Sequence, residues 1–438
     1  MEGINSNQRT IYITKTYKQR IKKTHPLYEL FTDITIKSKN LYNLALYTER
    51  QYYFEHKKII SRFTLQTMLK ETDAFKQLPS KASQMITHQV YQTMNSFLSA
   101  TKEYYKTPSK FLGKPRIPGY KDKTTGRNIV TFDYQQLRIL DNYKLRLPNN
   151  LGTLEIPSFL VSKQLILKPS TGSNTDLSYD PQAELIQLRI IPRFNLEFQL
   201  EFIYNEKITI EPKKTTETYI ASIDLGLDNF AAIVFYKPHT QPILINGKGL
   251  KSYNRNFNKR LANLKSQASL NGHKTTRRIQ ALHLKRQRYI DTWMHKTSRF
   301  IINQLKSNGI QYLVIGRNKN QKQNINLGHR TNQHFVQIPY HTFLKQLHYK
   351  CIEAGIHLLE VEESYTSGTS FLDNELPIKE NYNKSRRKYS GLFVTNKGFK
   401  INSDINAAYQ ILKKVPAFAP YIQSLSTLEY NPIKINVA

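Results

Sequence analysis

A carboxylate interrupts a long apolar stretch of this 438-residue sequence. Residues 219–227 predict a buried strand with Asp224 in its middle, and the apolar run resumes at Phe230, so the two segments predict a hairpin that turns between Gly226 and Asn229. Burying an unpaired carboxylate is costly, and a bound metal ion would offset that cost. The other interpretation is an aspartate that caps the turn at the end of the strand.

A second acid lies at the start of a predicted helix near the C-terminus. Residues 401–414 predict an alanine-containing helix whose first turn includes Asp404. An acid in the first turn complements the helix dipole, which accounts for Asp404 by itself. A strand aspartate followed by glycine, together with a late aspartate that opens a helix, also resembles the way in which ribonuclease-H-like nucleases bring acids to one metal site.

The charge balance of the chain predicts a polyanionic partner. The sequence has 65 Lys and Arg against 32 Asp and Glu, a formal net charge of +33, and this excess would repel itself in a lone compact protein. Phosphate groups would neutralise it, and the 28 Tyr and 21 Phe can stack on unpaired bases. We therefore expect a protein that binds nucleic acid.

Cysteine content and hydropathy exclude several other classes. Cys351 is the single cysteine, so the chain forms no internal disulfide and no zinc site built on cysteines. No apolar stretch has the length of a membrane span, and the polar N-terminus lacks the core of a signal peptide. We expect no membrane partner, and a cytoplasmic, nucleoid-associated protein of a prokaryotic cell.

The first half of the chain predicts a β-domain with a helical insertion. Helical periodicity marks residues 27–57, 64–71 and 81–106. Alternating and β-rich runs at 11–17, 129–140, 143–147, 153–156, 164–167 and 185–204 predict antiparallel strands of a barrel or sandwich. Residues 213–218 form a polar linker to the part of the chain that contains Asp224.

Two basic helices follow within residues 251–308, joined at residues 269–273. A charged helix face is usually just solvated, but like charges at helical spacing are destabilising unless they are neutralised. A phosphate backbone that runs along this hairpin would neutralise them. The residues that we expect to contact it are Lys251, Arg255, Lys259, Arg260, Arg277, Arg278, Lys285, Arg286 and Arg288.

Several short motifs occur in a characteristic order along the chain. They are the loop at 113–120, Ile223-Asp224-Leu225-Gly226-Leu227, His295-Lys296-Thr297-Ser298, Ser364-Tyr365-Thr366-Ser367 and Asn402-Ser403-Asp404-Ile405-Asn406-Ala407-Ala408. With the basic hairpin between them, this order resembles the TnpB (OrfB) family of transposon-encoded, RNA-guided DNA endonucleases, which are relatives of the type V CRISPR effectors. The similarity covers most of the chain and is strongest in its second half.

The resemblance implies a multidomain α+β fold. A wedge-like N-terminal β-barrel (1–20 and 107–212) would contain a helical recognition domain (21–106). A ribonuclease-H-like (RuvC) α/β nuclease domain (213–415) would follow, with the basic hairpin inserted at 251–308 and a tail at 416–438. A bound guide RNA would select target DNA by base pairing, and the protein would read a short flanking motif.

One expected acid is missing from its usual position. Family members usually end the strand that matches residues 312–315 with Glu, where this chain has Gly316. The neighbouring strand, at 356–361, runs into Glu362 and Glu363, and an acid there would reach the same site. We predict that Glu363 replaces the missing acid, as in a subgroup of the family, with Glu362 in reserve because strand alternation could favour either face. Two solvated acids at a strand end are the other interpretation.

A further departure concerns zinc. Many family members carry a four-cysteine zinc ribbon before the last aspartate, whereas residues 364–400 here contain no cysteine and several cations, among them Arg386 and Arg387. We expect no structural zinc and interpret the segment as a lid that touches nucleic acid. A disordered insert is the alternative.

The resemblance also implies the chemistry. Asp224, Glu363 and Asp404 would hold two divalent ions, with Asp224 as the bridge, and their carboxylates suit Mg²⁺ or Mn²⁺. One ion would activate water and the other would stabilise the leaving 3′ oxygen.

Two functions compete with this nuclease. A nuclease-dead, RNA-guided DNA-binding regulator is the first, but drift after loss of activity would have removed one of Asp224 and Asp404, and the chain keeps both. A tyrosine transposase is the second, and it would need a His-x-His pair, which the sequence lacks.

Overall fold

The computed structural model describes residues 9–140, 143–167, 182–194, 196–210, 217–317, 337–389, 391–418 and 427–437. The chain divides into two compact units, one comprising Thr10–Ile208 and the other Met1–Arg9 with Thr209–Ala438. None of the described helices combines the length and the apolar character that a membrane span requires. The predicted linker at 213–218 lies mostly outside the described residues. The finer division into wedge, recognition and nuclease domains stays a prediction.

The first unit contains the predicted helices. They are α1 (Tyr28–His56), α2 (Arg62–Leu69) and α4 (Ser80–Lys106), and a one-turn helix, α3 (Asp73–Lys76), joins α2 to α4. Helices α1 and α4 pack along each other through buried side chains such as Phe31, Leu41, Val90 and Met94. The apolar periodicity of these segments therefore predicted the helices correctly, whereas α3 is too short to produce a periodic pattern.

The strands of the first unit form two sheets. One sheet has the order β1-β8-β7-β2, with β6 also paired to β7, and the other has the order β3-β4-β5. Every predicted β-run contains a strand, but the predicted barrel is not confirmed, because the described strands form no closed barrel. The bounds are β1 (Arg9–Ile21), β2 (Val130–Asp133), β3 (Arg138–Leu140), β4 (Lys144–Arg146), β5 (Thr153–Glu155), β6 (Leu165–Leu167), β7 (Ala183–Arg193) and β8 (Glu197–Ile210).

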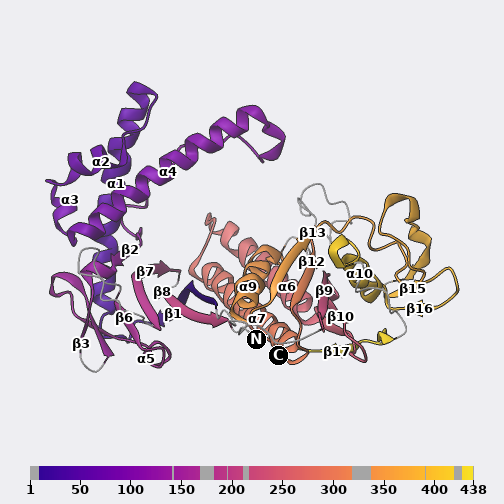
Figure 1. Ribbon diagram of the computed structural model, residues 1–438. Helices are drawn as coiled ribbons and strands as arrows, with labels where there is room; N and C mark the ends of the chain where they lie inside the picture. The colour runs from indigo at the N-terminus through magenta and orange to yellow at the C-terminus, as the bar shows by residue number, and fades with distance from the viewer. Residues whose placement is uncertain are drawn as a thin grey trace. The chain divides into compact units, whose positions relative to one another are not determined.

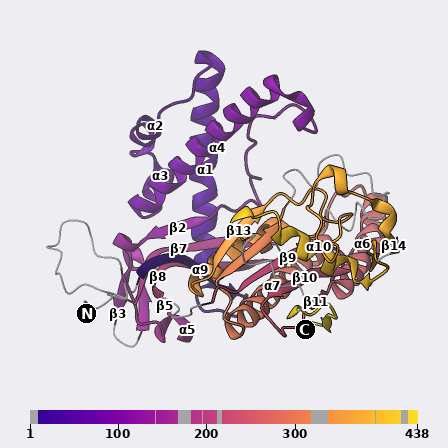
Figure 2. The same cartoon turned by 45° about the vertical axis from the view of Figure 1, so that its right-hand side comes forward.

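The second unit is built on a mixed six-stranded sheet, which Figures 1 and 2 show at its centre. The strand order is β13-β12-β9-β10-β11-β17; β9 pairs with β10 antiparallel and with β12 parallel, and β12 pairs with β13 parallel. The predicted hairpin is therefore present. The bounds are β9 (Ile220–Leu225), β10 (Asn229–Tyr236), β11 (Ile243–Asn246), β12 (Tyr312–Gly316), β13 (His357–Val361) and β17 (Ile433–Ile435).

Helices cover both faces of this sheet, which explains why β9, β10 and β12 are nearly continuous apolar runs. On one face, Ala221, Ile223 and Ile233 pack in one core with side chains of α7 (Arg277–Ser307) and α9 (Tyr340–Glu353). On the other face, Ala232 and Val234 pack against α10 (Ser403–Leu412). Successive strand residues thus serve opposite layers of the core.

The insert before α10 is folded. It contains the small sheet β14-β15-β16 (Arg387–Tyr389, Leu392–Val394 and Lys400–Ile401) and two short 3₁₀ turns. Phe371 and Phe393 are fully buried in the core beside α10. The described part of the segment is thus packed and not a disordered insert.

Candidate active site

Asp224 lies near the end of β9, a central strand of the sheet. It follows Ser222 by two residues and so projects from the same face, toward α10. The Ser222 hydroxyl donates to the Ala408 carbonyl of α10 at 2.6 Å and fixes strand and helix together. A Cβ on Gly226, in the turn that follows, would lie 2.6 Å from the Asn229 carbonyl oxygen, so the turn requires glycine.

Asp404 lies in the first turn of α10. The side chain of Asn402 caps the helix by accepting from the Asp404 and Ile405 amides. The Asp404 carboxylate accepts from Asn229 Nδ2 at 2.8 Å and from Arg387 Nη2 at 3.1 Å. The predicted helix and its acid are therefore placed at the sheet, where β10 and β14 supply the two donors.

Gly316 and Glu363 come together at the ends of two neighbouring strands. Gly316 is the last residue of β12 and pairs in register with Val361 of β13, two residues before Glu363. A Cβ at position 316 would lie 2.9 Å from Glu363 Oε2, 3.1 Å from Glu363 Cβ and 2.6 Å from Ile411 Cδ1. The Glu363 side chain therefore fills the space into which a side chain at position 316 would project.

Glu362 and Glu363 differ in position. Glu363 lines the pocket that contains Asp224 and Asp404, and its backbone carbonyl accepts from the Thr366 hydroxyl at 2.8 Å. Glu362 does not line that pocket; it is exposed and accepts a hydrogen bond from the Ser364 hydroxyl. Of the two acids, Glu363 is the one that faces the other carboxylates.

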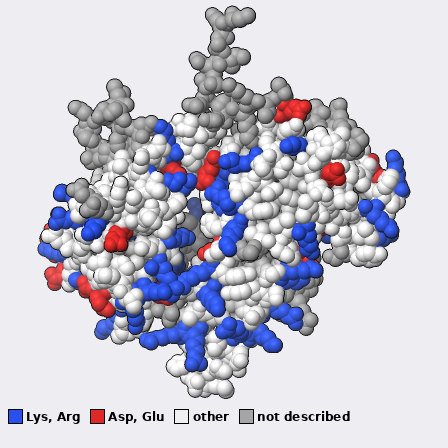
Figure 3. Space-filling model, turned by 90° about the horizontal axis from the view of Figure 1, so that it is seen from below, with Lys and Arg blue, Asp and Glu red and all other residues white. Residues whose placement is uncertain are grey.

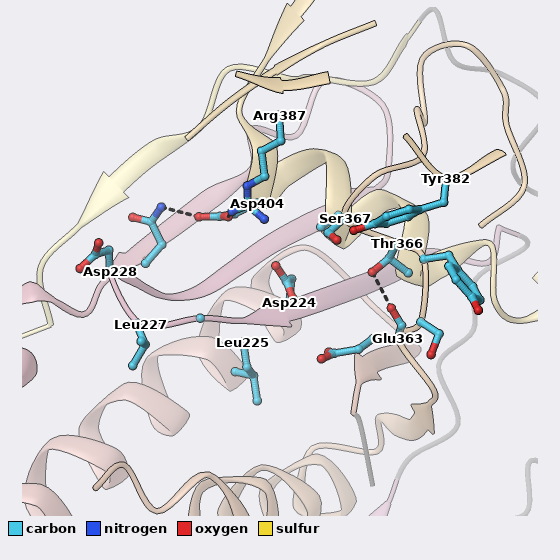
Figure 4. Close-up of a pocket in the computed structure, with 15 residues that line it drawn as sticks. Asp224, Leu225, Leu227, Asp228, Glu363, Thr366, Ser367, Tyr382, Arg387 and Asp404 are labelled. Atoms are coloured by element: carbon cyan, nitrogen blue, oxygen red, sulfur yellow. Dashed lines mark hydrogen bonds and ion pairs between the residues drawn. The ribbon is translucent and has the colours of Figure 1, made fainter. Parts of the chain in front are cut away.

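The acids share a polar pocket of about 670 Å³. Figure 4 shows Asp224 between Asp404 on one side and Glu363 on the other, with Arg387 reaching Asp404 from the insert. The pocket is lined by Asp224, Leu225, Gly226, Leu227, Asp228, Asn229, Glu363, Ser364, Tyr365, Thr366, Ser367, Tyr382, Arg387, Asp404 and Ala407.

Electrostatic repulsion between the acids of this pocket is only partly relieved by Arg387. Burial raises the pKa of Asp224 well above its usual range, the charges of Glu363 and Asp404 raise it further, and Arg387 opposes them. Burial and the charges of Asp224 and Glu363 also raise the pKa of Tyr340, whose hydroxyl donates to the Gly226 carbonyl at 2.7 Å. Additional positive charge at this position would therefore stabilise the ionised acids.

The donor chemistry fits a divalent cation, although the carboxylates are not gathered into a finished ligand set. Among the described residues, no three acidic, histidine or cysteine side chains lie close enough to one another to hold a metal ion as they stand. Asp404 is instead engaged by Asn229 and Arg387. Three carboxylates with mutual repulsion nevertheless offer the hard oxygen ligands that Mg²⁺ prefers.

Glu375 holds the insert together where many family members have zinc. Its carboxylate accepts from Arg386 Nη1 at 2.8 and 2.6 Å, from the Ser370 amide at 2.7 Å and from Asn396 Nδ2 at 3.1 Å. The Arg386 side chain is 14% exposed. Arg386, which we predicted to contact nucleic acid, thus has an internal partner, whereas Arg387 reaches the pocket.

The basic hairpin is present as α6 (Lys248–Leu270) and α7. Two of its predicted contact residues have internal partners: Arg286 donates to Asn254 Oδ1 and to the Gln337 carbonyl, both at 2.9 Å, and Lys251 pairs with Asp228 at 2.9 Å. Arg288 is partly buried. The remaining predicted residues are exposed, namely Arg255, Lys259, Arg260, Arg277, Arg278 and Lys285.

Basic side chains are also frequent on the surface that Figure 3 shows. In Figure 3, Lys and Arg are spread over the face seen from below, with few Asp and Glu among them. This distribution agrees with the net charge of +33 and provides the positive potential that a polyanion requires.

Sequence reasoning missed the contacts that orient the acids. Asn229 and Tyr340 were not singled out, although Asn229 binds Asp404 and Tyr340 binds the turn after Asp224. Asn229 lies five residues after Asp224 at the predicted turn, so the predicted hairpin already indicates that it lies near the acids. Tyr340 comes from a distant helix, and no local pattern identifies it.

Comparisons with known proteins match successive parts of the chain to one group. Residues 202–322 match the OrfB_IS605 family model, described as "probable transposase", and residues 340–411 match the Cas12f1-like TNB domain. The TnpB-like protein ORF457 of Acidianus two-tailed virus is 22% identical over 395 residues, which is 86% of this chain and 81% of that protein.

Two solved structures also overlap most of the chain at low identity. A Cas12f1–sgRNA–target DNA complex is 14% identical, with 92% of this chain and 100% of that chain covered and a TM-score of 0.36. Alicyclobacillus acidoterrestris C2c1 in complex with single-guide RNA is 10% identical, with 89% and 67% covered and a TM-score of 0.37. The two family models and the viral relative, of which 81% is matched, agree that this chain is similar to the TnpB (OrfB) group of proteins.

Proposed function

We propose that this protein is an RNA-guided DNA endonuclease of a transposable element. The observation that carries the proposal is the convergence of Asp224, Glu363 and Asp404 on one pocket, with Glu363 in the space that Gly316 leaves free. The family supplies the class of reaction, and the pocket supplies three acids from three separate segments of the chain. The bond that breaks would be a DNA phosphodiester.

Asp224, Glu363 and Asp404 would hold Mg²⁺ or Mn²⁺. Their carboxylates are hard oxygen ligands. Burial and the charges of the other two acids raise the pKa of Asp224, and positive charge would relieve the repulsion among the three. When bound, such ions supply an activated water and stabilise the leaving oxygen. This chain contributes the rigid attachment of the acids: β9 holds Asp224, the end of β13 holds Glu363, and the capped start of α10 holds Asp404.

Arg387 is the cation of the pocket. Its guanidinium contacts Asp404 in the protein alone, and a DNA phosphate in the pocket would offer it an alternative anionic partner. If the Arg387 guanidinium moved from the carboxylate to the phosphate, Asp404 would be free to bind a metal ion. Tyr382, which also lines the pocket, offers a ring edge to sugar or base.

The exposed cations of α6 and α7 would bind the backbone of the guide RNA or of its duplex with DNA. They include Arg277 and Arg278, which lie at the start of α7 without an acidic neighbour in that turn. Phosphate contacts of this kind set affinity and its dependence on salt, not sequence preference. Sequence would be selected by pairing between guide and target, with a short flanking motif read by the N-terminal unit, including its wedge-like strands and helical insertion.

A nuclease-dead regulator that binds DNA under the direction of RNA is the second candidate. Gly316 favours it, because the acid that most family members carry at this position is absent. The occupation of that space by Glu363 argues against it, since the site keeps three carboxylates.

The test begins with expression of the gene together with its native genomic flanks and sequencing of the RNA that copurifies. A plasmid matched to that RNA is then incubated with the complex and Mg²⁺. We expect cleavage by the wild type, and none by Asp224→Ala, which should still bind RNA and DNA. RNA-directed binding without cleavage by the wild type would establish the regulator instead, and cleavage by Asp224→Ala would overturn the site.

A further inference from the structure

A second pocket lies in the N-terminal unit, beside the three-stranded sheet β3-β4-β5. Its volume is about 330 Å³. It is formed by the 3₁₀ turn that follows β2, the start of β3, the end of β4 and the turn between β4 and β5, and none of its lining residues is acidic. The residues that line it are Gln135, Gln136, Arg138, Arg146, Leu147, Pro148, Asn149 and Asn150.

Two arginines face each other in this pocket. Arg138 of β3 and Arg146 of β4 are directly opposite in the antiparallel register, so both side chains leave the same face of the sheet, and both are exposed. The intervening pair, Ile139 and Leu145, points to the other face, where Leu145 is fully buried. Like charges in directly opposite positions destabilise a strand pair unless something neutralises them.

Both arginine side chains have guanidinium N–H groups that can still donate to a ligand. Arg146 Nη2 donates to Asn150 Oδ1 at 2.7 Å, which orients the guanidinium and leaves its other N–H groups open. The Arg138 side chain makes no hydrogen bond or ion pair with any other residue that the structure describes. The nearest acid on this face of the sheet, Glu155, lies opposite Lys144 and not opposite either arginine.

The rim of the pocket adds amides and a third cation. Asn149 and Asn150 have positive φ angles of 51° and 55°, a left-handed conformation that Asn tolerates better than most residues, and they form the turn closed by the Leu147 amide and the Gly152 carbonyl. On the other rim, Gln135 Oε1 accepts from Lys81 Nζ at 2.7 Å. The pocket thus combines a forked pair of cations with side chains that can donate and accept hydrogen bonds.

We infer that this pocket binds a phosphodiester group of a nucleic-acid strand. Two guanidinium forks offer the paired N–H donors that match phosphate oxygens, and one phosphate between them would turn their repulsion into attraction. The Asn and Gln amides would contact the adjoining sugar or base edge. The inference rests on the proposed function in one respect, because it assumes that the protein binds a nucleic acid, either guide RNA or target DNA. The contact that it adds lies far along the chain from the three acids of the candidate active site.

The test compares two cations of one strand. Lys144 and Arg146 lie two residues apart on the same face of β4, but only Arg146 lines the pocket. Full-length protein free of nucleic acid is prepared as wild type, as Arg138→Gln/Arg146→Gln, as Arg146→Lys and as Lys144→Gln. Binding of a labelled single-stranded RNA, of the same sequence as DNA and of a DNA duplex is measured as a function of salt concentration.

With at least one of the three nucleic acids, the slope of log affinity against log salt concentration should be smaller in magnitude for the double variant than for the wild type by about 1, the value for one lost phosphate contact. Lys144→Gln should leave the slope unchanged, and Arg146→Lys should keep the slope but weaken binding, because an ammonium lacks the fork. A change with RNA alone assigns the phosphate to the guide, and a change with DNA alone assigns it to the target. The melting temperature of the double variant should not fall, since its substitutions remove a like-charge pair.

An equal slope for the double variant and Lys144→Gln with all three probes would overturn the inference while leaving the nuclease proposal intact. A wild type that binds neither RNA nor DNA would contradict both. A double variant that melts well below the wild type would also count against the inference, because it would give the two arginines a structural role.

Discussion

Glu363 occupies the space that a side chain at Gly316 would need. The two residues come from neighbouring parallel strands, and a Cβ on Gly316 would lie 2.9 Å from Glu363 Oε2. The pocket therefore accepts an acid from the end of β12 or from the end of β13, but not from both. This exclusion explains how the chain lacks the acid expected at position 316 and still has three carboxylates around one pocket.

The exclusion predicts that Gly316→Ala impairs cleavage. The new methyl group would push away the Glu363 carboxylate, and a displacement of about 1 Å in an active site lowers the rate by roughly 10²-fold. Plasmid cleavage under the direction of the copurified RNA measures the effect. Gly249→Ala is the matched control, because a Cβ on Gly249 in α6 meets no atom within 4 Å.

The same exclusion predicts a rescue. Glu363→Gly should abolish cleavage, and the double variant Gly316→Glu/Glu363→Gly should regain part of it, because the acid then enters the pocket from β12. The Ile411 side chain, whose Cδ1 would lie 2.6 Å from the new Cβ, has to rotate, so full recovery is not expected. A double variant no more active than Glu363→Gly would show that the two strand ends are not interchangeable.

Asp224→Asn should make the protein more stable while abolishing cleavage. Asparagine has the same shape as aspartate but lacks the charge that Glu363 and Asp404 repel, the repulsion that contributes to the raised pKa of Asp224. A gain of about 1 kcal/mol corresponds to a melting temperature higher by about 2–4 °C in a unit of this size. Thermal unfolding of nucleic-acid-free protein in the presence of a chelator measures it.

Asp228→Asn serves as the control for this prediction. Asp228 lines the same pocket, but it is 46% exposed and pairs with Lys251, so its substitution should not raise the melting temperature. Added Mg²⁺ should raise the melting temperature of the wild type more than that of Asp224→Asn, by preferential binding to the folded state. An Asp224→Asn protein that melts below the wild type in chelator would contradict the electrostatic account.

Glu375→Gln should loosen the insert without unfolding the sheet. The substitution removes the charge that pairs with Arg386, whose side chain is only 14% exposed, and loss of one partner of a buried pair costs roughly 3–5 kcal/mol. Limited proteolysis with trypsin should therefore cut faster near Lys384 and Arg387. Glu380→Gln, an exposed change in the same insert, should digest like the wild type, and equal digestion of both variants would rule out this role of Glu375.

The sequence predicts the elements around the site well because each is a long or strongly patterned segment. The apolar run of β9 and β10, the capped start of α10 and the basic hairpin all follow from local patterns, and the structure contains each of them. The preference for Glu363 over Glu362 came from the resemblance to a family, and strand alternation alone left the two open. The structure places Glu363 in the pocket and Glu362 outside it.

Other features depend on contacts that are distant in sequence. Strand β17 is three residues long and pairs with β11, nearly two hundred residues earlier, so no local pattern marks it. The predicted barrel is not confirmed, since the described strands of the N-terminal unit form two sheets and no closed barrel; alternation indicates strands but not whether the first and last strands meet. Arg386 and Arg387 are adjacent in the sequence, yet one binds Glu375 and the other Asp404, and charge alone does not separate them.

The most direct test compares Glu363→Gln with Glu362→Gln. Both variants are purified with their copurified RNA and tested side by side for DNA binding and for Mg²⁺-dependent cleavage of a matched plasmid. The account predicts that both bind target DNA like the wild type, that Glu362→Gln cleaves it, and that Glu363→Gln does not. Cleavage by Glu363→Gln at the wild-type rate would contradict the claim that Glu363 supplies the acid missing at Gly316.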